Sequence, residues 1–161
     1  RIAKITISMN TISIRTANLT DLKTLLAFEQ GVVTAEKPLD TFLGSGKLTY
    51  YDIPELIADK NTHFIVAVSN EELVGSGYIK IENSNSYHKN PKHGYIGFIF
   101  VKPSFRGKKI STIVLESLKI WAKEKGLKEI RLDVYSNNSN AIKSYDSFGF
   151  TKSLVNMRID I

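Results

Sequence analysis

The chain has 161 residues, of which 42% are hydrophobic and 24% charged, a balance typical of one globular domain rather than of a disordered chain. It contains no cysteine, which excludes disulfides, thiolate metal sites and a cysteine nucleophile. The net charge is +6, but the basic residues are scattered, and no apolar run approaches the roughly 20 residues of a membrane helix. We therefore predict a cytoplasmic protein without a nucleic-acid or membrane partner. Met9 resembles a natural start, so residues 1–8 are interpreted as a leader or an added segment.

The first half of the chain predicts one strand and two helices. We expect a strand over residues 11–17, and then a helix capped by Asn18 or Thr20. This helix should direct Leu22, Leu25, Leu26 and Phe28 toward the core. Residues 31–51 are rich in glycine and are expected to be irregular. A short second helix is predicted over residues 53–60, with Pro54 in its first turn.

The second half predicts a hairpin followed by alternating strands and helices. The hairpin strands cover residues 63–69 and 72–82, and a polar loop follows them. The later elements are a strand over 95–101, a helix over 107–125 ended by Gly126, a strand over 129–135, a helix over 138–148 and a last strand over 150–159. The helix carries its apolar side chains at helical spacing, at Ile110, Ile113, Val114, Leu118 and Trp121.

These elements predict an α/β fold with one mixed sheet and helices on both faces. The strand over 95–101 is nearly all apolar, which is typical of a sheet covered on both sides. A strand–helix–strand unit crosses over right-handedly, so the strands at 95–101 and 129–135 should be parallel. Ligands of such sheets bind beyond the carboxyl ends of the parallel strands, where Arg106 and Asn138 fall.

The loop over residues 102–109 has the composition of an anion site. It leads from an apolar strand into a long amphipathic helix, and it carries Arg106, Gly107, Lys108 and Lys109. The first N–H groups of a helix have no partner within the helix, so basic side chains beside them make a site that suits a pyrophosphate.

Two motifs in this region resemble those of the GCN5-related N-acetyltransferase (GNAT) family. The family's acetyl-CoA loop, V-x-P-x-x-R-G-x-G-x-G/A, is matched by Val101, Pro103, Arg106 and Gly107, whereas Lys109 and Ser111 stand where small residues are usual. Its second signature, N-x-x-A-x-x-x-Y-x-x-x-G-F, is matched in full by Asn138, Ala141, Tyr145, Gly149 and Phe150. The resemblance is strong over residues 64–155. It implies a single N-acetyltransferase domain over 1–161, whose mostly antiparallel sheet contains two splayed parallel strands.

The resemblance implies an enzyme that uses acetyl-CoA as cosubstrate and no metal. The residues expected to bind the coenzyme are Phe100, Val101, Arg106, Gly107, Lys108, Lys109, Ile110, Ser111, Asn138 and Tyr145. Tyr145 matches the tyrosine that the family places near the coenzyme sulfur as a general acid. The oxyanion donor should be a main-chain N–H at Phe100 or Val101, in a strand that Gly97 allows to bulge. Without a cysteine for an acyl-enzyme, an acceptor amine should attack the thioester directly in a ternary complex.

The general base is the least defined part of the expected site. Many family members carry a glutamate on the strand that corresponds to 95–101, but this strand has no acidic residue. Glu29 is the preferred base, and Glu36, Glu82, His88, His93 and Tyr95 are the other candidates. Glu29, Glu36 and Tyr95 are also expected to bind the substrate, within walls formed by residues 28–52 and 84–94. The three histidines do not form a metal set.

Two glutamates among aromatic residues indicate a small cationic amine or a peptide amino group as the acceptor. A protein amino terminus or lysine is an alternative acceptor. The absent strand acid and the altered loop also leave open a non-catalytic acyl-CoA sensor. We expect a monomer or a homodimer.

Overall fold

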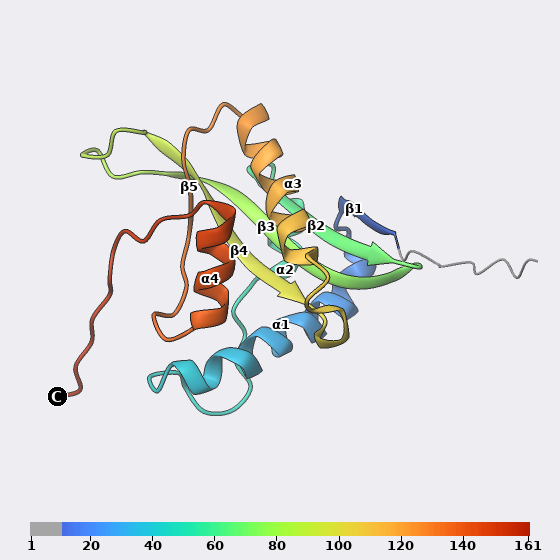
Figure 1. Ribbon diagram of the computed structural model, residues 1–161, viewed down its shortest axis with the longest axis horizontal. Coiled ribbons are helices and arrows are strands. Elements are labelled where there is room, and N and C mark those ends of the chain that lie inside the picture. The colour runs from blue at the N-terminus through green and yellow to red at the C-terminus, as the bar shows by residue number, and fades with distance from the viewer. Residues whose placement is uncertain (1–10) are drawn as a thin grey trace, which may run out of the picture.

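The computed structural model describes residues 11–161, so Met9 and the interpretation of residues 1–8 lie outside the described residues. Most of the predicted elements are present, in the predicted order (Figure 1). In chain order they are β1 (Ile12–Thr16), η1 (Leu19–Asp21), α1 (Leu22–Glu36), η2 (Lys37–Leu39), α2 (Ile53–Ala58), β2 (Thr62–Ser69), β3 (Glu72–Asn83), β4 (Lys92–Val101), η3 (Pro103–Phe105), α3 (Ile110–Glu124), β5 (Ile130–Leu132) and α4 (Ser139–Phe148).

The strands form one sheet in the order β1-β2-β3-β4-β5. The first three pairings are antiparallel, whereas β4 and β5 are parallel, which confirms the predicted mixed sheet. The hairpin between β2 and β3 turns at Asn70 and Glu71, whose φ angles are 47° and 66°. Positive φ at both central residues gives a turn whose twist matches that of the flanking strands.

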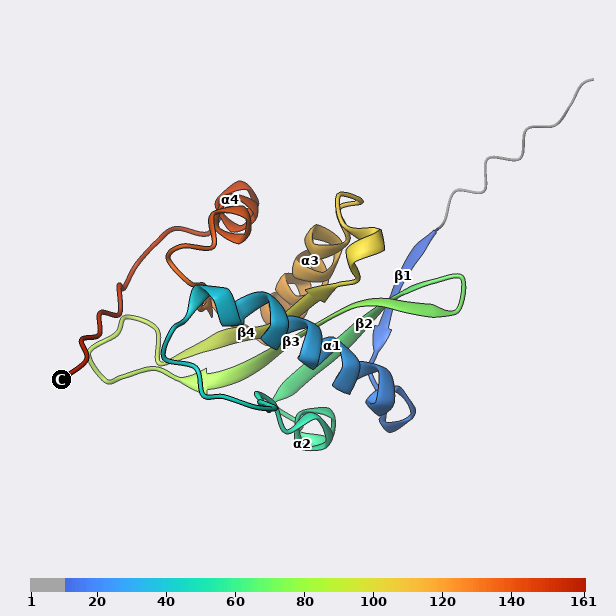
Figure 2. The ribbon, with the colours of Figure 1, turned by 90° about the horizontal axis from the view of Figure 1, so that it is seen from below.

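Helices cover both faces of the sheet, as predicted (Figure 2). On one face α3 packs against the sheet through Ile110, Val114, Leu115 and Leu118, and α4 adds partly buried residues at the edge of that cluster. On the other face α1 and α2 bury Leu25, Phe28 and Ile53 against Phe64, Val66, Tyr78 and Phe98. The sheet residues of both clusters are almost fully buried, which explains the apolar run of β4.

Side-chain caps set where the helices begin. Asn18 accepts a hydrogen bond from the Thr20 N–H at 2.9 Å, and Asp21 accepts one from the Asn18 N–H, so the two residues form a capping box. Asp52 caps α2, and Asn138 caps α4 by accepting from the Ala141 N–H at 3.2 Å. Gly149 ends α4 with a φ of 115°, a left-handed conformation that favours glycine.

The structure corrects several predicted boundaries. The first helix continues through residues 31–36, because packing of its buried face outweighs the cost of Gly31. Leu26 and Ile113 are 46% and 38% exposed and do not point into the core. The helix predicted over 107–125 begins at Ile110, and α2 ends at Ala58.

The last two predicted strands differ most from the structure. β5 has three residues rather than seven, because β4 diverges from it and leaves no further partner on that side. The strand predicted over 150–159 is not formed, and residues 151–161 run away from the sheet as an extended segment (Figure 1). Within residues 11–161 no helix combines the length and the apolar character needed to cross a membrane.

Candidate active site

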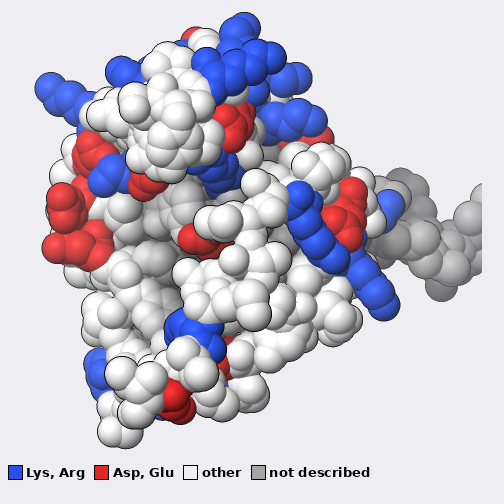
Figure 3. All heavy atoms as spheres, turned by 90° about the vertical axis from the view of Figure 1, so that its left-hand side faces the viewer, with Lys and Arg blue, Asp and Glu red and all other residues white. Residues whose placement is uncertain are grey.

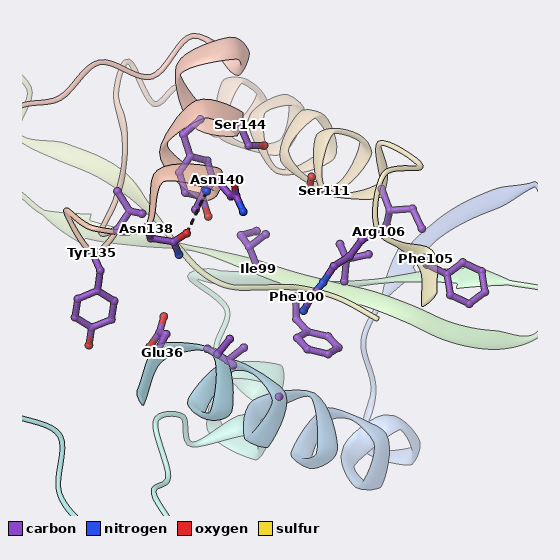
Figure 4. Close-up of a pocket in the computed structure, with 18 of the residues that line it drawn as sticks. Glu36, Ile99, Phe100, Phe105, Arg106, Ser111, Tyr135, Asn138, Asn140 and Ser144 are labelled. Atoms are coloured by element: carbon purple, nitrogen blue, oxygen red, sulfur yellow. Dashed lines mark hydrogen bonds between the residues drawn. The ribbon is translucent and has the colours of Figure 1, made fainter. Parts of the chain in front are cut away.

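The candidate site is a cavity of about 440 Å³ where β4 and β5 part. The two strands pair from Gly94 to Ile96 and from Ile130 to Leu132, and beyond these residues they diverge. Residues from α1, β4, the loop before α3, the segment after β5, and α4 surround the gap (Figure 4). The cavity therefore lies beyond the carboxyl ends of the parallel strands, where the sequence predicted a ligand.

A bulge in β4 lies just before Ile99, Phe100 and Val101, the residues of this strand that line the cavity. The β3–β4 register shifts between Ser76 and Tyr78, and Phe98 has a φ of 53°, which is unusual for a bulky residue. A Cβ atom on Gly97 would lie 2.4 Å from the Tyr78 hydroxyl, so only glycine fits there without a shift of Tyr78. The predicted bulge at Gly97 is thus confirmed.

The carboxyl end of β4 presents a main-chain N–H group to the cavity. The Lys102 N–H donates to the Val74 carbonyl at 2.8 Å and so points toward β3. Because N–H groups alternate in direction along a strand, the Val101 N–H points the other way, toward the gap left by β5. Of the two predicted positions for an oxyanion donor, Val101 has this orientation, although both Phe100 and Val101 line the cavity.

The loop before α3 closes one end of the cavity. Gly107 and Lys109 have φ angles of 77° and 60°, and this double left-handed turn directs the chain into α3. The predicted coenzyme residues Arg106, Gly107, Lys109, Ile110 and Ser111 all line the cavity, and the Arg106 side chain points into it (Figure 4).

Lys108 does not line the cavity. Its ammonium group lies over the Phe105 ring, 4.7 Å from the centroid. Lysine in the left-handed conformation of Lys109 costs about 1 kcal/mol relative to glycine, which accounts for the glycine in the family motif.

Asn138 and Tyr145 bring α4 to the same cavity. Asn138 lines it while its side chain caps the helix, so the two predicted roles of this residue are compatible. The Tyr145 ring packs against Phe150 with centroids 5.8 Å apart. Burial, with the charge of Glu36 adding to it, raises the pKa of Tyr145, so its hydroxyl is neutral at physiological pH.

Glu36 is the glutamate that the structure brings to the cavity. It is the last residue of α1, not part of a loop as predicted, and it lies on the wall opposite Asn138 and Asn140 (Figure 4). Burial raises the pKa of Glu36, a hydrogen bond with the Tyr50 hydroxyl opposes part of this rise, and the nearby Asp40 carboxylate adds to it. A carboxylate with a raised pKa is a stronger base at neutral pH.

Glu29, the preferred base, occupies a different position. It is 1% exposed, and its Oε1 accepts hydrogen bonds from the main-chain N–H groups of Tyr50 and Tyr51 at 2.7 and 2.9 Å. It does not line the cavity. These contacts hold the 49–52 segment against α1, so the role of the Glu29 carboxylate is structural.

The other candidates for the base also lie away from the cavity wall. Tyr95 donates to Asp133 at 3.2 Å, and Asp133 itself does line the cavity. His93 is buried, 2.8 Å from the Ser84 hydroxyl and 3.6 Å from Glu82. Glu82 and His88 do not line the cavity either. Among residues 11–161, no group of three or more metal-ligating side chains is arranged to hold an ion.

Part of the wall predicted over residues 28–52 is present, because α1 lines the cavity, whereas no residue of the wall predicted over 84–94 lines it. Sequence reasoning missed the wall supplied by the segment after β5. Lining residues that the sequence did not single out are Gly31, Val32 and Ala35 within that predicted wall, Ile99 and Phe105 near β4, Asp133, Val134 and Tyr135 after β5, and Asn140 and Ser144 on α4. Gly31 carried a usable signal, because a glycine inside a helical pattern often marks a close approach. A Cβ atom there would lie 2.5 Å from the Phe100 ring.

Side chains of both charges lie on the surface around the site. Figure 3 views the side of the molecule that carries β5 and the C-terminal segment. Basic side chains are most numerous at the top of this view and also occur at its centre, right and bottom, and acidic side chains lie along the left margin and in the middle of the face.

Comparison with known proteins agrees with this geometry. Residues 29–150 match the model of the acetyltransferase (GNAT) family. A mutant of the BH1408 protein from Bacillus halodurans has a TM-score of 0.84 and 21% identity, over 92% of this chain and 99% of that one. A predicted acetyltransferase from Clostridium acetobutylicum, solved with acetyl-CoA, has a TM-score of 0.68 and 19% identity over 93% and 96%.

An aminoglycoside 6'-N-acetyltransferase from Acinetobacter haemolyticus has a TM-score of 0.69 and 18% identity, over 92% of this chain and 99% of that one. Identities this low show a shared fold and not a shared acceptor. No protein with curated annotation matches the chain in sequence. The family model spans three quarters of the residues and the fold agrees over nearly all of them, so the chain belongs to the GNAT acetyltransferase family.

Proposed function

We propose that the protein transfers the acetyl group of acetyl-CoA to a primary amine by direct attack in a ternary complex. One observation carries this proposal. The cavity at the β4–β5 splay joins a basic loop at a helix start, an open strand edge, and two ionisable groups on opposite walls, Glu36 and Tyr145.

The coenzyme would lie along the gap between the strands. Its pyrophosphate suits the N–H groups at the start of α3, with Arg106 beside them. Its thioester would then reach the middle of the cavity, where the Val101 N–H can donate to the carbonyl oxygen as negative charge develops there. The lysine at 109 leaves these N–H groups available, because they belong to the main chain.

The acceptor amine would enter from the side of Glu36. Glu36, directly or through a water molecule, takes a proton from the ammonium form, and the free amine attacks the carbonyl carbon. Glu36 passes this proton to solvent. A C–N bond forms, and the C–S bond then breaks, so that the electron pair leaves with the sulfur. The second proton, which the nitrogen loses as it becomes the amide, replaces the one that Tyr145 gives to the sulfur. Asp133, on the same cavity, adds negative charge that favours a cationic acceptor such as a small amine or a peptide amino group.

Tyr145 would supply the proton that the leaving sulfur needs. A tyrosine hydroxyl, with a pKa of about 10, is a weaker acid than a thiol at about 8.5, so transfer to a free thiolate is unfavourable by about 2 kcal/mol. The raised pKa of Tyr145 increases this cost. The proton transfer must therefore be coupled to the collapse of the tetrahedral intermediate, which is favourable, rather than follow it.

A thiol-release assay tests the proposal directly. The protein is incubated with acetyl-CoA and a panel of small amines, aminoglycosides and peptides, and free coenzyme thiol is measured. Acetyl-CoA should also raise the melting temperature, because it binds the folded state. Arg106→Glu should abolish most of that rise, whereas Lys108→Glu, the same charge change outside the cavity, should retain most of it.

The outcomes separate the candidate functions. Turnover with one class of amine supports the enzyme and identifies its acceptor. Binding of acetyl-CoA without turnover across the whole panel would instead support a non-catalytic acyl-CoA sensor. If Arg106→Glu and Lys108→Glu behave alike, the proposed phosphate site is wrong.

A further inference from the structure

The ring of Phe100 separates the cavity from the hydrophobic core beneath α1. Phe100 lies just after the bulge of β4, and its side chain points from the strand toward α1 (Figure 4). The ring lines the cavity and also packs against the buried cluster that contains Phe28 and Phe98, which are 3% and 2% exposed. On the side of α1 the cavity therefore ends at this ring, and the core continues behind it.

Neighbouring residues hold the Phe100 ring in its place. Its centroid lies 4.6 Å from that of the Phe28 ring, and the two planes are tilted by 32°. Its far edge meets α1 at Gly31, where a Cβ atom would lie only 2.5 Å from the ring. Aromatic rings at this separation attract each other, and a packed interior takes up an extra methylene only at a cost in free energy. The ring is thus a fixed wall of the cavity.

α1 supplies the other side of an apolar recess beside this ring. Gly31, Val32 and Ala35 all line the cavity, and none of them has a polar side chain. Residues three and four positions apart lie on one face of a helix, so these three form a continuous wall. With Phe100 at its inner end, the recess suits a short apolar group, and its four residues offer no side chain that could pair with a polar one.

The geometry of a thioester directs its acyl chain to this recess. The carbonyl carbon is trigonal, so the oxygen, the sulfur and the acyl chain leave it in three directions within one plane. In the proposed complex the oxygen faces the Val101 N–H, and the sulfur faces Tyr145 on the α4 wall. The third direction leads to the wall that α1 and Phe100 form. The acceptor amine approaches across the plane from Glu36, about one helical turn beyond Val32.

We propose that the Phe100 ring limits the acyl group to acetyl, an inference that rests on the proposed function and adds the choice of acyl donor. The methyl group of acetyl-CoA fits between the ring and Val32. Each further methylene would have to displace the ring from Phe28 and Gly31. One methylene in an apolar pocket changes kcat/KM by about 10–200-fold, so propionyl-CoA should be used at least about tenfold less efficiently than acetyl-CoA.

A series of acetyl-, propionyl- and butyryl-CoA tests the role of Phe100, by steady-state thiol release and by calorimetric measurement of binding. For the unmodified protein, kcat/KM and affinity should both fall as the acyl chain lengthens. Phe100→Leu shortens the wall and should reduce the acetyl-to-propionyl ratio of kcat/KM by about tenfold. Phe105→Leu is the matched control, because this ring lines the cavity beside the loop before α3, and it should leave the ratio unchanged.

A second variant makes the test independent of the stability of Phe100→Leu. Val32→Ala widens the same recess from the side of α1 and should also reduce the ratio, and thermal unfolding is measured for every variant. If the protein binds none of the three donors, the proposed function fails, and the inference fails with it. If it binds or uses all three equally well, or if Phe100→Leu and Val32→Ala both keep the ratio of the unmodified protein, only the role of Phe100 is overturned.

Discussion

The same substitution at the two glutamates of α1 should have different effects, one on stability and one on turnover. Glu29→Gln and Glu36→Gln therefore test the proposed site. Glu29 is buried and accepts two main-chain hydrogen bonds, whereas Glu36 lines the cavity. Glutamine nearly keeps the shape of glutamate and removes its charge. The first change should therefore reduce stability, and the second should reduce turnover.

The structure sets the size of each effect. A hydrogen bond to a charged group contributes about 1.5–3 kcal/mol, and a glutamine oxygen retains part of it, so Glu29→Gln should cost about 1–2 kcal/mol in the free energy of unfolding. For a domain of this size the melting temperature should fall by about 2–8 °C. Glu36→Gln removes a carboxylate whose charged form is disfavoured by burial, so it should leave the melting temperature unchanged or raised. Loss of a general base should lower kcat about 10²-fold or more.

The assay is steady-state thiol release with the best acceptor, measured beside thermal unfolding and acetyl-CoA binding for both variants. Glu29→Gln should keep its kcat among the folded molecules, and Glu36→Gln should keep its affinity for acetyl-CoA. Full kcat in Glu36→Gln would refute the proposed base. A loss of kcat in Glu29→Gln at unchanged stability would return the role to Glu29.

Three further predictions concern the acid, pH and the bulge. Tyr145→Phe should keep the fold and the coenzyme affinity but lower kcat about 10²-fold, and the loss should be smaller for an acyl donor whose thiol leaves more readily. If the variant has the same kcat as the unmodified protein, Tyr145 is a packing residue. The value of kcat/KM should rise as pH increases through the raised pKa of Glu36, and the Glu36→Gln profile should lack that limb. Gly97→Ala places a Cβ atom against the buried Tyr78 and should cost about 1–3 kcal/mol by chemical denaturation, whereas Gly46→Ala, in open space at a φ of 87°, should cost only the backbone strain of about 1 kcal/mol.

The sequence by itself determined the fold class and the residues at the end of the cavity where we propose that the coenzyme binds. Local signals sufficed there: alternation and helical spacing for the elements, the caps at Asn18 and Asn138, and two motifs that place Arg106 and Tyr145 beyond parallel strands. These features depend on residues near one another in the chain, so their pattern can be read without the contacts between distant segments.

Only the tertiary structure decided the acceptor side. Glu29 and Glu36 are seven residues apart on one helix, about two turns, and their sequence surroundings do not distinguish them. Glu29 lies outside the cavity because it accepts hydrogen bonds from the N–H groups of Tyr50 and Tyr51, which are distant in sequence. Glu36 lies at the cavity because α1 continues past Gly31, where the helix approaches Phe100. The strand predicted over 150–159 depended on distant contacts in the same way, since an alternating segment becomes a strand only where it pairs with the edge of a sheet.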